Sequence, residues 1–182
     1  MTLEFTTSFL KDAVEMLRYY KRLAERAMEQ TPEAALFATL DAESNSIAII
    51  VKHMCGNMRS RWTDFLTTDG EKPDRNRDTE FEAAVKTRAD LMTQWEVGWK
   101  CVFDALTPLS ESDLSRRVII RTEAHSVMQA INRQLAHYAY HTGQIVYLAK
   151  HFTGANWKAL TIPRGKSAEF STEVTTGKKS QR

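Results

Sequence analysis

The sequence predicts an all-α protein, an antiparallel bundle of four long helices, and three observations support this fold class. The 182 residues include only 7 Gly and 4 Pro, and so few turn residues indicate few, long elements. Apolar residues recur at spacings of three and four in four segments of about 20–27 residues, which is the periodicity of amphipathic helices. The one β-branched run is too short to form a sheet by itself.

The first two helices lie before the first polar stretch. Residues 5–30 carry apolar residues at helical spacing, and the helix ends before Pro32 because proline cannot continue it. A second helix begins at Asn45 or Ser46, either of which can act as its N-cap, and runs to about Leu66. These two segments supply one half of the predicted bundle.

A long connection separates the second helix from the third. Residues 67–78 are polar and rich in Gly, Pro, Asn and Asp, so they are predicted to form a loop. The loop is long enough to cross over the bundle or to fold across one end of it. Thr79 and Glu82 have the spacing of a capping box, which predicts a third helix from Thr79 to about Leu106.

The last third of the chain combines a short extended run with the fourth helix. Residues 118–120 (Val-Ile-Ile) are predicted to be an isolated extended stretch or one arm of a small hairpin. The fourth helix begins near His125 or Ser126 and runs to about Lys150. We expect one domain over residues 1–166 and a polar, mobile C-terminal tail over residues 167–182.

Composition limits the classes of function. The 25 Lys and Arg residues nearly balance 23 Asp and Glu residues, so the charge predicts neither nucleic acid nor a membrane as partner and favours a small-molecule substrate. Cys55 and Cys101 lack the spacing of a disulfide framework, which indicates reduced thiols in a cytoplasmic protein. The N-terminus does not resemble a signal peptide, and no apolar run approaches the ~20 residues that span a bilayer.

Helix geometry divides the five histidines into three that can converge and two that cannot. A helix turns about 100° per residue, so His137 and His141 lie about 40° apart, one turn above the other, and can reach one point. His125 lies about 120° around the same helix, and His151 lies roughly 15 Å further along its axis. His53 is in the middle of the second helix, on a face that must be buried, and can approach the pair from there.

Three imidazoles suit a divalent metal ion. They leave Zn²⁺ or Ni²⁺ open positions for water or substrate, and such an ion lowers the pKa of a bound water or thiol. Asn57 follows His53 by four residues and Gln144 follows His141 by three, so both are candidates to support the ligands or a cofactor. Cys55 points about 200° away from His53 and is excluded as a ligand.

Other interpretations stay open from the residues alone. A histidine such as His53 can be a buried residue with satisfied hydrogen bonds, and an HxxxH pair can occur on a helix by coincidence. Arg75 and Arg77 of the predicted loop can be solvated or can receive an anionic cofactor. The chain contains no Glu-x-x-His, HExxH, GxSxG, P-loop or GxGxxG motif, so no catalytic residue is predicted.

The late segment His137-Tyr-Ala-Tyr-His141-Thr-Gly-Gln144, with a histidine about fifty residues into the chain, resembles the DinB-like (YfiT-like) superfamily of metalloenzymes. The HxxxHxGQ pattern is the most specific part of a likeness that covers residues 5–167. Three further stretches are similar to a bacterial subgroup without an assigned function: His53-Met-Cys-Gly-Asn57, Asp69-Gly-Glu-Lys-Pro73 and Ile162-Pro-Arg-Gly165.

The resemblance implies a four-helix bundle whose divalent metal is held by His53, His137 and His141, the three that helix geometry also selects. Relatives in the superfamily are thiol-dependent transferases or isomerases that use thiols such as bacillithiol or mycothiol, and homodimers are common among them. We therefore expect a metal-dependent S-transferase acting on small electrophiles, with Zn or Ni and a low-molecular-weight thiol as cofactors. A hydrolase, or a non-catalytic dimeric metal-binding or stress-response protein, is the alternative.

Overall fold

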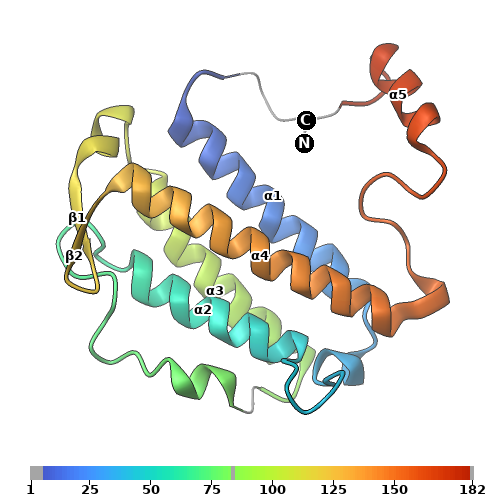
Figure 1. Cartoon of the computed structure of the whole chain (residues 1–182), viewed down its shortest axis with the longest axis horizontal. Coiled ribbons are helices and arrows are strands. Elements are labelled where there is room, and N and C mark those ends of the chain that lie inside the picture. Colours follow the sequence, from blue (N-terminus) through green and yellow to red (C-terminus); the bar gives the residue numbers. More distant parts are fainter. Residues whose placement is uncertain (1–5, 83–84, 181–182) are drawn as a thin grey trace.

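The computed structural model describes residues 6–82 and 85–180 and is mostly helical (Figure 1). This confirms the all-α class, with a small hairpin added. The long helices among these residues are α1 (Phe9–Gln30), α2 (Ile47–Trp62), α3 (Arg88–Leu106) and α4 (Val127–Thr153). The shorter elements are η1 (Glu33–Leu36), η2 (Asp78–Phe81), η3 (Glu111–Ser115), β1 (Arg117–Ile120), β2 (Glu123–Ser126), η4 (Gly154–Asn156) and α5 (Ser167–Thr175).

The long helices pack side by side around one core. Helix α1 packs along α4 and α2 packs along α3, while α2 also contacts α4 (Figure 1). Trp62 from α2, Trp99 from α3 and Tyr138 from α4 meet in this core and are almost fully buried. The indole Nε1 of Trp62 donates to the hydroxyl of Tyr138 at 3.0 Å, so the polar ends of these two side chains are satisfied, whereas the buried Nε1 of Trp99 has no hydrogen-bond partner among the described residues.

Two helix starts agree with the sequence analysis. Ser46 is the N-cap of α2, where its hydroxyl accepts from the amide of Ile49. Ser126 caps α4 and forms a capping box with Gln129. Helix α2 ends at Trp62, four residues before the predicted end, and the chain turns at Asp64, which has a left-handed φ of 48°.

The predicted start of the third helix is wrong. Helix α3 begins at Arg88, where the Thr87 hydroxyl caps the amide of Asp90. Thr79 does not cap a helix; it lies in the short η2 turn, and its hydroxyl donates to the backbone oxygen of Asn76, which precedes that turn. The η2 turn packs against α2, and the buried carboxylate of Glu80 fixes it there. The apolar spacing around residue 81 therefore belongs to this packed turn and not to α3.

The extended run is one arm of a hairpin. Strands β1 and β2 pair antiparallel, with Val118 opposite His125. Arg121 and Thr122 form the turn with φ values of 53° and 68°, and the carboxylate of Asp69 accepts both of their backbone amides at 2.8 Å. The sequence of β2 has little β-propensity, which is why it was not recognised as a strand.

The connection between α2 and α3 folds back along α2, beneath it in Figure 1, and does not cross the bundle. At the other end of the chain, α5 lies within residues 167–182, where no helix was predicted (Figure 1). Mobility of this tail stays a prediction. None of the helices in the described ranges is long and apolar enough to span a membrane.

Candidate metal centre

Three histidines from two helices converge. Helix α2 supplies His53 and helix α4 supplies His137 and His141, which lie one turn apart. The Nε2 atom of His137 lies 3.3 Å from Nε2 of His53 and 3.1 Å from Nε2 of His141. His53 is buried and the other two are half-buried. The structure therefore brings together the three residues that the angular argument selected.

These spacings fit a metal ion. In a tetrahedral zinc site with Zn–N bonds of about 2.0–2.1 Å, two ligand nitrogens lie about 3.3 Å apart. The two Nε2–Nε2 distances to His137 are close to that value, and one ligand atom from each histidine lies within 4.8 Å of the others. A three-histidine group of this geometry can hold a divalent ion.

In two of the imidazoles, a hydrogen bond at Nδ1 leaves Nε2 free to act as a metal ligand. Nδ1 of His53 lies 2.8 Å from Oε2 of Glu80, and Nδ1 of His141 lies 2.7 Å from Oε1 of Gln144. The Glu80 carboxylate can only accept, so Nδ1 of His53 carries the proton. The Gln144 amide, whose Nε2 donates to Tyr140, turns its oxygen to His141 and favours the same tautomer there. Each Nε2 then presents a lone pair toward the shared point, as a metal requires.

Glu80 belongs to a chain of charges that runs away from the histidines. Its two oxygens accept from Nε and Nη2 of Arg75 at 2.8 and 2.9 Å. Arg75 also pairs with Glu71 at 3.1 Å, and Glu71 lies 3.3 Å from Arg121 in the hairpin turn. Burial alone would raise the pKa of Glu80, but the hydrogen bonds from His53 and Arg75 lower it, so the carboxylate is charged.

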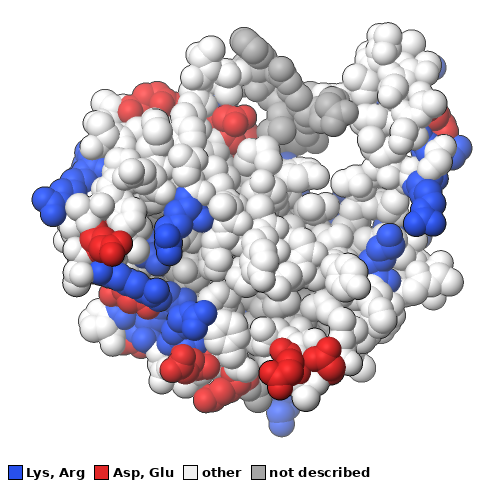
Figure 2. Space-filling model, viewed as in Figure 1, with Lys and Arg blue, Asp and Glu red and all other residues white. Residues whose placement is uncertain are grey.

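The surface over this network carries both signs of charge. Figure 2 shows blue and red side chains mixed at the lower left, over the hairpin and the connection that follows α2. Arg75 is committed to Glu71 and Glu80, and Arg77 lies over the ring of Phe81 at 5.0 Å. The buried Arg75 side chain thus supports the site from inside and is not available to an anionic cofactor, whereas Arg77 is exposed and covers Phe81 from the surface.

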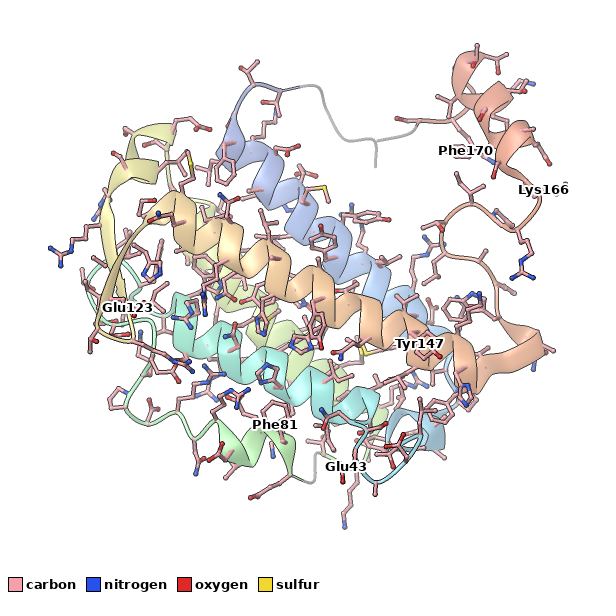
Figure 3. All side chains as sticks on the ribbon, viewed as in Figure 1. Glu43, Phe81, Glu123, Tyr147, Lys166 and Phe170 are labelled. Atoms are coloured by element: carbon pink, nitrogen blue, oxygen red, sulfur yellow. The ribbon has the colours of Figure 1, made fainter. Side chains whose placement is uncertain are left out.

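Aromatic rings flank the histidines. Phe81, placed beside α2 in Figure 3, stacks on His53 with ring centroids 4.8 Å apart. Tyr140 packs against His141, and its hydroxyl accepts from Nε2 of Gln144 at 3.2 Å. Phe81 therefore shields one side of the site, while the exposed Tyr140 marks the side that faces solvent.

The surroundings keep two imidazoles neutral. Burial, followed by the neighbouring histidines, lowers the pKa of His137 to about 3. Burial also lowers the pKa of His141, against the opposing effect of its hydrogen bond with Gln144. A neutral imidazole is the form that binds a metal, so both rings are ready to coordinate at neutral pH.

The remaining predicted residues fall in different places. Asn57 accepts from the hydroxyl of Tyr138 at 3.1 Å, and no hydrogen bond joins it to the three imidazoles within the described residues. Cys55 faces α3, close to Gly98, and burial raises its pKa to about 12. Gln144 contacts His141 directly. Roles for Asn57 and Gln144 in cofactor binding stay predictions.

Glu80 was not found from the sequence, and Arg75 was named for a different role, as a possible receiver of an anionic cofactor. Glu80 and Arg75 lie in an irregular segment, where no helical or strand periodicity shows which side chains turn inward. Their own spacing of five residues is not a recognised motif. The available signal was Gly56, an unexplained glycine inside a predicted helix, because such a glycine often marks a close approach by another segment.

Comparison with known proteins assigns the sequence to a family. The sequence model of a family described as "Protein of unknown function (DUF1572)" matches residues 4–166. The chain belongs to this family. The DUF1572 match includes all three histidines and ends immediately before α5. No curated protein and no solved structure matches the chain. The chemistry of the DUF1572 site must therefore be argued from its residues.

Proposed function

We propose that the protein is a divalent-metal-dependent enzyme, with His53, His137 and His141 as the ligands of a Zn or Ni ion. The observation that carries this proposal is the convergence of three imidazoles, in which Nε2 of His137 lies at the spacing of tetrahedral ligands from both other Nε2 atoms and all three ligand atoms lie within 4.8 Å of one another. Three protein ligands are the number that catalytic zinc sites use, since a further position is kept for water or substrate. Imidazole ligands suit both ions.

The proposed reaction is transfer of a low-molecular-weight thiol to a small electrophile. An ion at this site would supply Lewis acidity that lowers the pKa of a bound thiol or water and so provides a nucleophile near neutral pH. Glu80 and Gln144 hold the Nδ1 protons of His53 and His141 and so keep both rings oriented. Phe81 covers one side of His53 and limits the approach of water from there.

The resemblance to the DinB-like superfamily supports the same reaction. Under this proposal the four long helices form a DinB-like antiparallel four-helix bundle, and the protein is a cytoplasmic homodimer that acts on a small molecule. The contacts of α1 with α4, α2 with α3 and α2 with α4 agree with such a bundle. Sedimentation analysis of the purified protein tests the dimer.

Metal stoichiometry tests the ligand set. We expect the zinc-loaded wild type to hold one ion per chain and His141→Ala to lose it. His151→Ala is the matched control, because His151 lies on the same helix, is exposed and is outside the group. Full zinc content in His141→Ala would refute the proposed site.

Turnover tests the reaction. We expect the loaded wild type to consume bacillithiol, mycothiol or glutathione in the presence of a chloronitrobenzene or bimane electrophile, and the chelated protein to lose this activity. A loaded protein that holds one ion but shows no thiol-dependent or hydrolytic turnover would favour the non-catalytic metal-binding alternative.

A further inference from the structure

The Nδ1 atoms of the three histidines, which point away from the shared centre, differ in their hydrogen bonds. Nδ1 of His53 and Nδ1 of His141 each have an acceptor, Glu80 and Gln144. Nδ1 of His137 is buried and has no hydrogen-bond partner among the described residues. His137 therefore lacks the outer contact that metal-bound histidines almost always make.

The tautomers of the other two rings decide where His137 carries its proton. Because His53 and His141 are protonated on Nδ1, both present a lone pair to Nε2 of His137, at 3.3 and 3.1 Å. In the metal-free protein, Nε2 of His137 must then carry the proton and donate it between them. A metal ion needs a lone pair on that same atom. Metal binding therefore requires His137 to take the other tautomer, with its proton on Nδ1.

Gln134 offers the acceptor that this tautomer needs. It precedes His137 by three residues on α4, a spacing at which side chains of a helix meet. Helical side chains lean toward the N-terminus, so Gln134, one turn earlier, is a residue that the outer side of the His137 ring can reach. Gln134 is 2% exposed, and its Oε1 is a buried acceptor without a partner among the described residues. An unpaired donor site and an unpaired acceptor thus lie one helical turn apart.

We propose that Gln134 is the positioning residue of His137, whose Nδ1 proton its amide oxygen accepts when Nε2 binds the metal. This inference rests on the proposed metal site. The number of protons on the ring does not change, since Nε2 releases one to solvent and Nδ1 takes one up. In the structure Nδ1 of His137 and Oε1 of Gln134 are both without a partner among the described residues, so the proposed hydrogen bond forms only when the ring changes tautomer.

Zinc titration tests the proposal with three variants. Gln134→Leu keeps the size and burial but removes the acceptor, so we expect zinc affinity to fall about 10–100-fold. Gln134→Glu restores an acceptor and should recover most of the lost affinity. Thr142→Val is the matched control, because Thr142 is a buried residue of α4 whose hydroxyl also lacks a partner among the described residues. It should bind zinc as the wild type does.

Nitrogen NMR of the histidine rings gives the readout that a purely structural role would not move. We expect the proton of His137 on Nε2 without zinc, and on Nδ1, protected from exchange, with zinc. In zinc-loaded Gln134→Leu that protection should be lost. Wild-type affinity in Gln134→Leu, or an unprotected Nδ1 proton in the loaded wild type, would overturn the role of Gln134 alone. A wild type that takes up no zinc would overturn the metal site and this inference together.

Discussion

Gly56 and Glu80 are in such close contact that any side chain at position 56 would displace the Glu80 carboxylate. A Cβ built at Gly56 would overlap Oε1 of Glu80 and would lie 2.7 Å from its Cδ. Glycine costs about 1 kcal/mol relative to alanine in a helix interior. Because Gly56 has no side chain, the Glu80 carboxylate can lie against the surface of α2 and reach Nδ1 of His53.

Gly56→Ala should therefore weaken metal binding although alanine is the better helix former. We expect zinc affinity to fall about 10-fold or more, because Glu80 is displaced from His53. Gly143→Ala is the control: Gly143 lies in α4 with nothing within 4 Å of its added Cβ, so this variant should gain about 0.5–1 kcal/mol of stability. Calorimetric zinc titration and urea unfolding measure the two effects. Unchanged zinc affinity in Gly56→Ala would contradict the role of the contact.

Glu80→Gln should lower both stability and zinc affinity. The substitution removes the charge that Arg75 and the His53 proton share, and the Arg75 side chain is only 5% exposed. Arg75 keeps its ion pair with Glu71, so we expect a loss of about 1.5–3 kcal/mol, the contribution of hydrogen bonds to a charged group. Urea unfolding of Glu80→Gln against the exposed control Glu82→Gln measures this cost. Equal stability of the two variants would show that the Arg75–Glu80 pair contributes nothing.

Acid should destabilise the metal-free protein through His137. Its pKa is lowered from 6.5 to about 3 in the folded chain, mainly by burial. Between these values the unfolded chain binds a proton that the folded chain does not, so the free energy of unfolding falls as the pH drops from 6.5 toward 3. Urea unfolding between pH 7.5 and pH 5 measures the slope. His137→Gln should flatten it and His151→Gln should not; an unchanged slope in His137→Gln would contradict the assignment.

The hairpin turn offers a test of stability away from the metal. Thr122 has a φ of 68°, which costs a β-branched residue about 1 kcal/mol or more. Thr122→Gly should therefore raise stability by about 1 kcal/mol. Asp69→Ala should lower it by a similar amount, because the Arg121 and Thr122 amides lose their acceptor. Thermal unfolding measures both effects. A stabilised Asp69→Ala would contradict the view that the Asp69 carboxylate holds the hairpin turn through these two hydrogen bonds.

Regular periodicity explains what could be predicted from the sequence. His137 and His141 lie four residues apart on a helix, so their convergence follows from the helical repeat alone. His53 lies on a helix whose buried face was also readable, because its apolar neighbours repeat at the same spacing. The starts of α2 and α4 were predicted to within one residue, at Asn45 or Ser46 and at His125 or Ser126, because capping preferences are local, and the structure has Ser46 and Ser126 as the caps.

The parts that were not predicted depend on contacts between distant segments. Glu80 reaches His53 across 27 residues of chain, from a turn whose side chains have no repeat. The Thr79 and Glu82 spacing predicted a helix start that packing of η2 on α2 overrides. Asn57 shares the helical face of His53 but is engaged by Tyr138, a partner that only the packing of α2 on α4 brings near.

X-ray absorption spectroscopy of the zinc-loaded protein tests the central claim most directly, because it counts the imidazoles around the ion. The account predicts three imidazole nitrogens at about 2.0–2.1 Å, with further light scatterers from solvent, and replacement of solvent by one sulfur when a thiol is added. His53→Ala should reduce the count to two imidazoles. A site that shows no imidazole, or whose spectrum is the same in His53→Ala, would contradict the account.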